Sequence, residues 1–118
     1  MKRRMAAATV ATFVLAFGTE AGAQDPARIE KGKQVYDVAM PKCKACHSIG
    51  GAGNVKGPLD GVGSKLEADE IKAWMRTPKA MTEKSKAPRK PFMPVYPKVK
   101  LSDEDLEALT AYMLSLKK

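Results

Sequence analysis

Both cysteines and the only histidine of this 118-residue chain lie together, as Cys43-Lys44-Ala45-Cys46-His47. Two thiols separated by two residues can form thioether bonds with the two vinyl groups on one edge of a porphyrin. The next residue, His47, would then lie under the ring, where its imidazole can supply one axial nitrogen to the iron. The motif therefore predicts one covalently attached c-type haem per chain, held by Cys43, Cys46 and His47.

Other kinds of chemistry also use a CxxC pair. A haem-free thiol-disulfide oxidoreductase needs a strand leading into the motif within a βαβ pattern, and no such strand is legible in the sequence. A tetrahedral zinc site needs four ligands, whereas two cysteines and one histidine offer three. A structural disulfide at this separation is sterically poor and leaves His47 unexplained. Haem attachment is therefore the preferred hypothesis, and a thiol-disulfide oxidoreductase is the alternative from another class.

The N-terminus has the pattern of an export signal. Lys2, Arg3 and Arg4 form a positive region, residues 5–17 are an apolar run, and Ala21-Gly22-Ala23 has the small residues of a cleavage site. The apolar run is shorter than the roughly 18 residues needed to span a bilayer. We therefore predict a secretory signal peptide over residues 1–23 and a periplasmic or otherwise exported location. No stable membrane insertion is expected after cleavage.

Residues 24–118 are long enough for one small domain, in which a large apolar cofactor would complete the core. The formal net charge is +8, and signal cleavage removes three basic residues and one acidic residue, leaving +6. Such a surplus favours an acidic protein, anionic lipid or nucleic acid as partner. Export disfavours nucleic acid, and the sequence contains no nucleic-acid-binding motif. We therefore expect redox protein partners with an acidic docking surface.

Three helices with long loops between them are expected. Asp25-Pro26 is typical of a helix start, and this helix should run to about Ala39. Helical spacing of apolar residues over 66–77 predicts a second helix, ended by Pro78. Ser102, followed by three acidic residues, should cap the last helix. The glycine-rich residues 49–63 and the proline-rich residues 78–100 are expected to be irregular, and no strand pattern is visible.

Nearly all of the chain after the export signal resembles the class I c-type cytochromes. Gly32 and Tyr36 match the glycine and aromatic residue that, in this family, cross against the C-terminal helix, here at Leu109 and Tyr112. The resemblance implies an all-α, small cytochrome c fold. In it the N- and C-terminal helices cross, and a middle helix and long loops wrap around one covalent haem.

The resemblance also assigns roles to residues outside the haem motif. Gly57-Pro58 resembles a family Gly-Pro pair whose proline carbonyl accepts the proton on the second nitrogen of the haem histidine, which fixes the tautomer. The alternative is that Pro58 is an ordinary turn residue. Trp74 lies where many relatives have a tyrosine near the axial methionine. Its indole either donates toward the sulfur or a propionate, or packs on the porphyrin.

The sulfur of Met93 is predicted to be the sixth ligand of the iron. Four methionines follow the haem motif, and Met75 and Met113 lie on apolar helix faces, where methionine usually fills the core. Met93 lies between two prolines, whose restricted φ angles stiffen an extended segment. It also precedes the last helix by the short stretch that the family resemblance implies. Met81, close to the end of the preceding helix, is the alternative.

His47 and Met93 would fill both axial positions of the iron, so the haem would exchange electrons rather than bind a substrate. The sequence therefore predicts a periplasmic one-electron carrier that is not an enzyme. The alternative is a cytochrome subunit of a periplasmic dehydrogenase complex, which a large exposed apolar patch would favour. The protein is thus expected to be a monomer or a subunit of a complex.

The basic segment, residues 78–100, is expected to help dock the acidic partner near the haem edge, where its charges would steer the encounter. A loop that is basic only for solubility is the alternative. Its basic residues are Lys79, Lys84, Lys86, Arg89, Lys90, Lys98 and Lys100.

Overall fold

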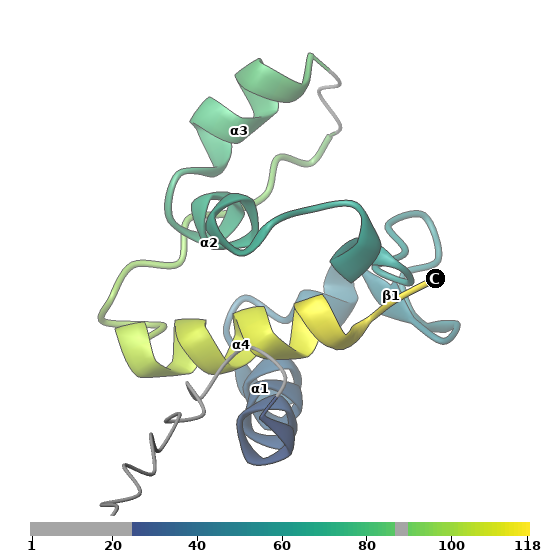
Figure 1. The fold of residues 1–118 in the computed structure, drawn as a ribbon. Coiled ribbons are helices and arrows are strands. Elements are labelled where there is room, and N and C mark those ends of the chain that lie inside the picture. The colour runs from purple at the N-terminus through teal and green to yellow at the C-terminus, as the bar shows by residue number, and fades with distance from the viewer. Residues whose placement is uncertain (1–24, 87–89) are drawn as a thin grey trace, which may run out of the picture.

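Helices make up most of the computed structural model, which describes residues 25–86 and 90–118 (Figure 1). The predicted signal peptide, residues 1–23, lies outside the described residues. The helices are α1 (Pro26–Val38), α2 (Ala68–Arg76), α3 (Pro78–Ser85) and α4 (Asp103–Ser115), with 3₁₀ turns at Cys43–Ala45 and Val62–Ser64. The expected all-α fold is confirmed. No helix in these described ranges is long and apolar enough to cross a membrane.

The crossing of α1 and α4 is the main helix contact and confirms the expected arrangement (Figure 1). A Cβ atom on Gly32 would lie 2.0 Å from the carbonyl oxygen of Ala108 and 2.7 Å from the Cβ of Tyr112. Glycine is therefore required at this position because the two backbones approach too closely for a side chain. Beside it, the rings of Tyr36 and Tyr112 meet edge to face, with centroids 6.0 Å apart.

The helix starts follow the capping signals of the sequence. The Asp25 carboxylate accepts a hydrogen bond from the Ala27 amide, and the Ser102 hydroxyl accepts one from the Asp105 amide. The start of α2 lies two residues later than expected. Glu67 is its N-cap and exchanges side-chain-to-backbone hydrogen bonds with Glu70, which closes a capping box.

The prediction that residues 78–100 contain no helix is wrong, because α3 occupies the first eight of them. Pro78 is at the first position of α3, where its missing N–H and fixed φ angle favour a helix. The Thr82 hydroxyl donates to the Pro78 carbonyl oxygen at 2.8 Å. The helix ends where Lys86 adopts a left-handed conformation, with φ of 53°. The described part that follows, residues 90–100, contains no helix or strand.

The glycine-rich segment is less irregular than expected. β1 (Ser48–Ile49) pairs with β2 (Ala52–Gly53) in an antiparallel hairpin directly after the haem motif. Its two-residue turn is Gly50-Gly51, with φ angles of 57° and 81°. Positive φ at both central residues is the requirement of a type I′ hairpin turn, which glycine meets without strain. The hairpin fixes the direction in which the chain leaves the motif.

Candidate functional site

A cavity of about 820 Å³ lies between the haem motif, α2, α4 and the segment before α4. This volume is within the range of roughly 300–1,000 Å³ that is usual for sites of small molecules and cofactors. Buried apolar residues of the helices, including Ile71 and Leu109, form part of its wall. The cavity is also lined by every residue that the sequence predicts at the site, namely Cys43, Cys46, His47, Pro58, Trp74 and Met93.

The haem motif forms a tight turn at the edge of this cavity. The amides of Cys46 and His47 both donate to the Cys43 carbonyl oxygen, at 3.2 and 2.9 Å. This turn brings both thiols and the imidazole to one cavity, although the Cys43 side chain is buried and Cys46 is exposed. The two cysteines are not joined by a disulfide. Their arrangement suits attachment to one edge of a planar ring.

The imidazole of His47 is oriented by a backbone carbonyl. Its Nδ1 lies 3.0 Å from the Gly57 carbonyl oxygen. A carbonyl can only accept, so Nδ1 carries the proton and Nε2 keeps the lone pair that binds a metal. The predicted second-sphere contact is therefore present, but the acceptor is Gly57 and not Pro58.

The extended pairing of residues 57–59 with Ser48 explains why Gly57, and not Pro58, accepts from His47. The Ser48 amide donates to the Gly57 carbonyl, and the Leu59 amide donates to the Ser48 carbonyl. Gly57 thus directs its carbonyl toward the haem motif. Successive carbonyls of an extended segment point in opposite directions, so the Pro58 carbonyl faces away. Pro58 still contributes to the cavity wall.

The Cys43 thiol does not resemble the nucleophile of a disulfide oxidoreductase. Burial raises its pKa, whereas the reactive cysteine of such enzymes has a lowered pKa. The chain preceding the motif is helix α1 and a short connection, not the strand that a βαβ unit requires. Within residues 25–86 and 90–118, moreover, no three His, Cys, Asp or Glu side chains are grouped to hold a metal ion. These three observations oppose a thiol-disulfide oxidoreductase and a metal site as interpretations of the motif.

Three of the four methionines after the motif line the cavity. Met93 is half-buried in the segment before α4, as predicted. Met75 on α2 and Met113 on α4 also line the cavity. These two methionines therefore do more than fill the core between helices. Met81, on α3, is not among the lining residues in the described chain. The geometry therefore weakens the case for Met81 as a ligand.

Several cavity residues were not anticipated from the sequence. Thr82 and Ser85 reach the cavity from α3, a helix that the sequence does not predict. Tyr96 also lines it, and its hydroxyl donates to the Pro41 carbonyl oxygen at 2.6 Å. Burial raises the pKa of Tyr96 to about 12, so the hydroxyl remains a donor at neutral pH. In the sequence, only its position three residues after Met93 indicates that Tyr96 belongs to the site.

The cytochrome c family matches residues 29–117 of this chain. The chain belongs to the cytochrome c family. Cytochrome c oxidase subunit 2 of Alkalihalophilus pseudofirmus is 32% identical over 111 residues, which cover 85% of this chain and 30% of that protein. The chain thus spans less than a third of the length of this relative. No solved structure matches the chain.

Family membership and the cavity agree on the cofactor. This cytochrome c binds haem c covalently, and its motif Cys43 to His47 has the required spacing. The cavity wall is largely apolar, and its thiols and imidazole suit the vinyl groups and the iron of a haem. Membership of the cytochrome c family supports electron transfer by this haem.

Proposed function

We propose that this cytochrome c is a one-electron carrier outside the cytoplasm, not itself an enzyme, with its iron held by His47 and Met93. The observation that carries the proposal is that both side chains line the cavity shared by Cys43 and Cys46. When bound, the haem supplies reversible one-electron chemistry. A methionine sulfur opposite a histidine favours reduced iron more than a second nitrogen does. If His47 and Met93 both hold the iron, no ligand position would be left for a substrate.

A set of methionine variants tests the ligand assignment. Leucine conserves the volume of methionine, so Met→Leu at each of the four positions should preserve the fold. The haem-loaded proteins are compared by the weak red absorption band of Met-ligated ferric haem and by reduction potential. We expect only Met93→Leu to abolish the band and to lower the potential. Met75→Leu, Met81→Leu and Met113→Leu should retain the band.

Each other pattern has a definite meaning. Loss of the band in Met81→Leu, with Met93→Leu unaffected, would transfer the ligand role to Met81. Loss in the Met75 or Met113 variant would assign the role to a helix residue. A band absent from the unchanged protein, or retained by all four variants, would show that the iron is not bound by these methionines.

Positive charge around the cavity supports an acidic redox partner. Lys42, Lys56, Lys65 and Lys90 line the cavity in addition to its apolar wall. The described lysines of the basic segment are all exposed. Opposite charges on a partner would steer it toward the haem site and raise the rate of encounter. An exported location, suggested by the signal-like N-terminus, is compatible with maturation of haem c outside the cytoplasm.

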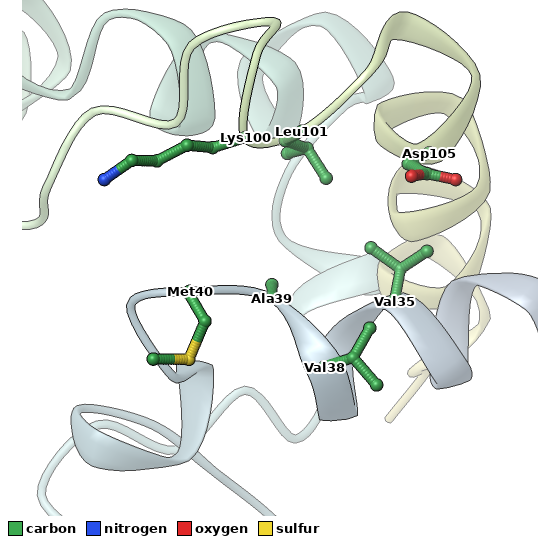
Figure 2. Close-up of a pocket in the computed structure, with 7 residues that line it drawn as sticks. All are labelled: Val35, Val38, Ala39, Met40, Lys100, Leu101 and Asp105. Atoms are coloured by element: carbon green, nitrogen blue, oxygen red, sulfur yellow. The ribbon is translucent and has the colours of Figure 1, made fainter.

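A second candidate function is that of a subunit in a larger redox complex. A groove of about 250 Å³ lies between the end of α1 and the start of α4 (Figure 2). Val38 and Met40 line it and are 68% and 59% exposed, and Val99, next to the lining residue Lys100, is 90% exposed. Exposed apolar side chains of this kind are typical of an interface. The relative named above is itself an oxidase subunit.

Purification from the native source separates the two candidates. A subunit should co-elute with an oxidoreductase at constant stoichiometry, and Val38→Ser with Met40→Ser should dissociate it without changing the haem spectrum. Elution as a monomer from the native extract, with electron transfer unaffected by both substitutions, would support the freely diffusing carrier.

A further inference from the structure

Arg76, in the last turn of α2, joins α2 to the chain that follows Met93. Its Nη1 donates to the carbonyl oxygens of Tyr96 and Leu101, at 2.6 and 2.8 Å. Its Nη2 lies 2.9 Å from the Asp103 carboxylate at the start of α4. The Arg76 side chain is 21% exposed, so these contacts are partly shielded from water. One guanidinium thus holds three points of a segment that is 20 to 27 residues away in the sequence.

Tyr96 joins the contacts of Arg76 to the haem site. Its carbonyl accepts from Arg76, its amide donates to the Met75 carbonyl at 2.9 Å, and its hydroxyl donates to Pro41. Pro41 is two residues before Cys43. Tyr96 therefore connects the end of α2 to the chain that attaches the haem, and the residue is only 4% exposed.

In the described chain, the residues around Met93 have little other anchoring. Phe92 and Val95 are 57% and 53% exposed, so burial of their side chains contributes little to the position of the segment. Met93 and Pro94 are half-buried at the cavity. The placement of the Met93 sulfur therefore depends strongly on the fixed point three residues later, at Tyr96.

The chemistry of the guanidinium suits this task. Its planar fork carries five donors and can bind two carbonyls and a carboxylate at the same time. A lysine ammonium is a point charge on a flexible stem and cannot hold three acceptors in this fixed geometry. Hydrogen bonds from a charged donor are also stronger than those between neutral groups.

We propose that Arg76 is a positioning residue that holds the Met93 sulfur in place for the iron. The inference rests on the proposed ligation by Met93 and goes beyond it. Arg76 is not among the described residues that line the cavity, and it acts through Tyr96 and Leu101. Without its guanidinium, the segment that carries Met93 would keep the hydrogen bond between the Tyr96 amide and the Met75 carbonyl but lose the other three contacts with α2 described above. The sulfur would then leave the iron more often.

The test uses the haem-loaded ferric protein and imidazole as a competing ligand. Imidazole binds the iron only when the methionine has left, so its binding rate reports how often the sulfur dissociates. We expect Arg76→Gln to raise this rate about tenfold or more, since hydrogen bonds to charged groups are worth that much. Arg76→Lys should give an intermediate increase, and the red Met-ligation band should weaken in both variants.

Lys72→Gln provides a matched control. Lys72 also lies on α2 and binds α4, through a 2.6 Å ion pair with Glu107, but among the described residues no hydrogen bond or ion pair joins it to residues 93–101. The Lys72→Gln variant should leave the rate of imidazole binding and the red band unchanged. Equal effects of Lys72→Gln and Arg76→Gln would overturn the proposal, because they would show a general loosening of α2 against α4.

The remaining outcomes also decide the question. Unchanged imidazole binding in Arg76→Gln, with the red band present in the unchanged protein, would refute the positioning role and leave Met93 ligation intact. Absence of the band from the unchanged protein would refute both. If Arg76→Gln does not retain haem, Arg76→Lys is measured in its place, and a rate equal to that of the unchanged protein would again refute the role.

Discussion

Replacing Gly32 by alanine should destabilise the protein by separating α1 from α4. The new Cβ would lie 2.0 Å from the Ala108 carbonyl oxygen, whereas ordinary contacts begin at 3.4 Å. The helices must therefore move apart locally by roughly 1.4 Å, the difference of these two distances. A gap of about 1 Å already removes a quarter to a half of the dispersion attraction between facing side chains. Val35 and Leu109, both buried, would lose contacts in this way.

The net effect is the balance of two opposing terms. Overpacking of a close contact costs about 1–3 kcal/mol, and we take the upper end, because the obstacle is backbone and cannot rotate away. Alanine is better than glycine inside a helix by about 1 kcal/mol. The expected loss in the free energy of unfolding is thus about 2 kcal/mol. For a domain of this size it corresponds to a melting temperature lower by on the order of 10 °C.

Unfolding of the haem-loaded protein in guanidinium chloride, monitored by circular dichroism, measures this loss in the free energy of unfolding. Gly50→Ala is the comparison, because no atom lies within 4 Å of its new Cβ and only the φ of 57° opposes the substitution. Its cost should be about 1 kcal/mol, the strain of a left-handed residue. A Gly32→Ala protein as stable as the unchanged one would show that the helix propensity term dominates. The close crossing of α1 and α4 would then be wrong.

Three further predictions concern the cavity and its charge. Tyr36→Phe should raise stability by about 1 kcal/mol, because the buried Tyr36 hydroxyl has no hydrogen-bond partner among the described residues; a loss of stability would reveal a partner in the haem-loaded protein. Denaturing mass spectrometry after expression with a haem c maturation system should show the polypeptide plus one haem, and Cys43→Ser with Cys46→Ser should show the bare mass; a bare mass for the unchanged protein would contradict covalent attachment. Electron transfer to an acidic partner should slow as ionic strength rises, and replacing both lysines of α3 by glutamate should slow it at low salt; rates indifferent to both changes would show that the basic segment does not take part in docking.

The sequence predicts correctly those elements that are marked by residues close together in the chain. Asp25 and Ser102 cap α1 and α4 as their residue types suggest, and the haem motif, with Met93, lines a single cavity. The sequence does not predict α3, because the prolines at 78, 88, 91, 94 and 97 together indicate one irregular segment. Pro78 differs from the prolines at 91, 94 and 97, since it begins a helix and they lie outside one. The four residues that follow it contain no further proline or glycine.

Contacts between distant segments were not predictable from residue types. The choice of Gly57 over Pro58 as acceptor for His47 depends on how residues 57–59 pair with Ser48, which is a tertiary feature. Arg76 carries no motif, and its acceptors are backbone carbonyls that any residue possesses. A sequence pattern identifies groups that can do chemistry, whereas these contacts depend on the path of the chain.

The position of α3 affects how readily the haem accepts an electron. Thr82 and Ser85 line the cavity, but their hydroxyls are already bound to the carbonyls of Pro78 and Thr82. The helix therefore covers this side of the cavity while offering few polar groups to it. Oxidised haem carries one more positive charge than reduced haem and gains more from nearby water, so excluding water favours reduction. The residues of α3 thus become a means of setting the driving force of electron transfer without changing the residues proposed to hold the iron.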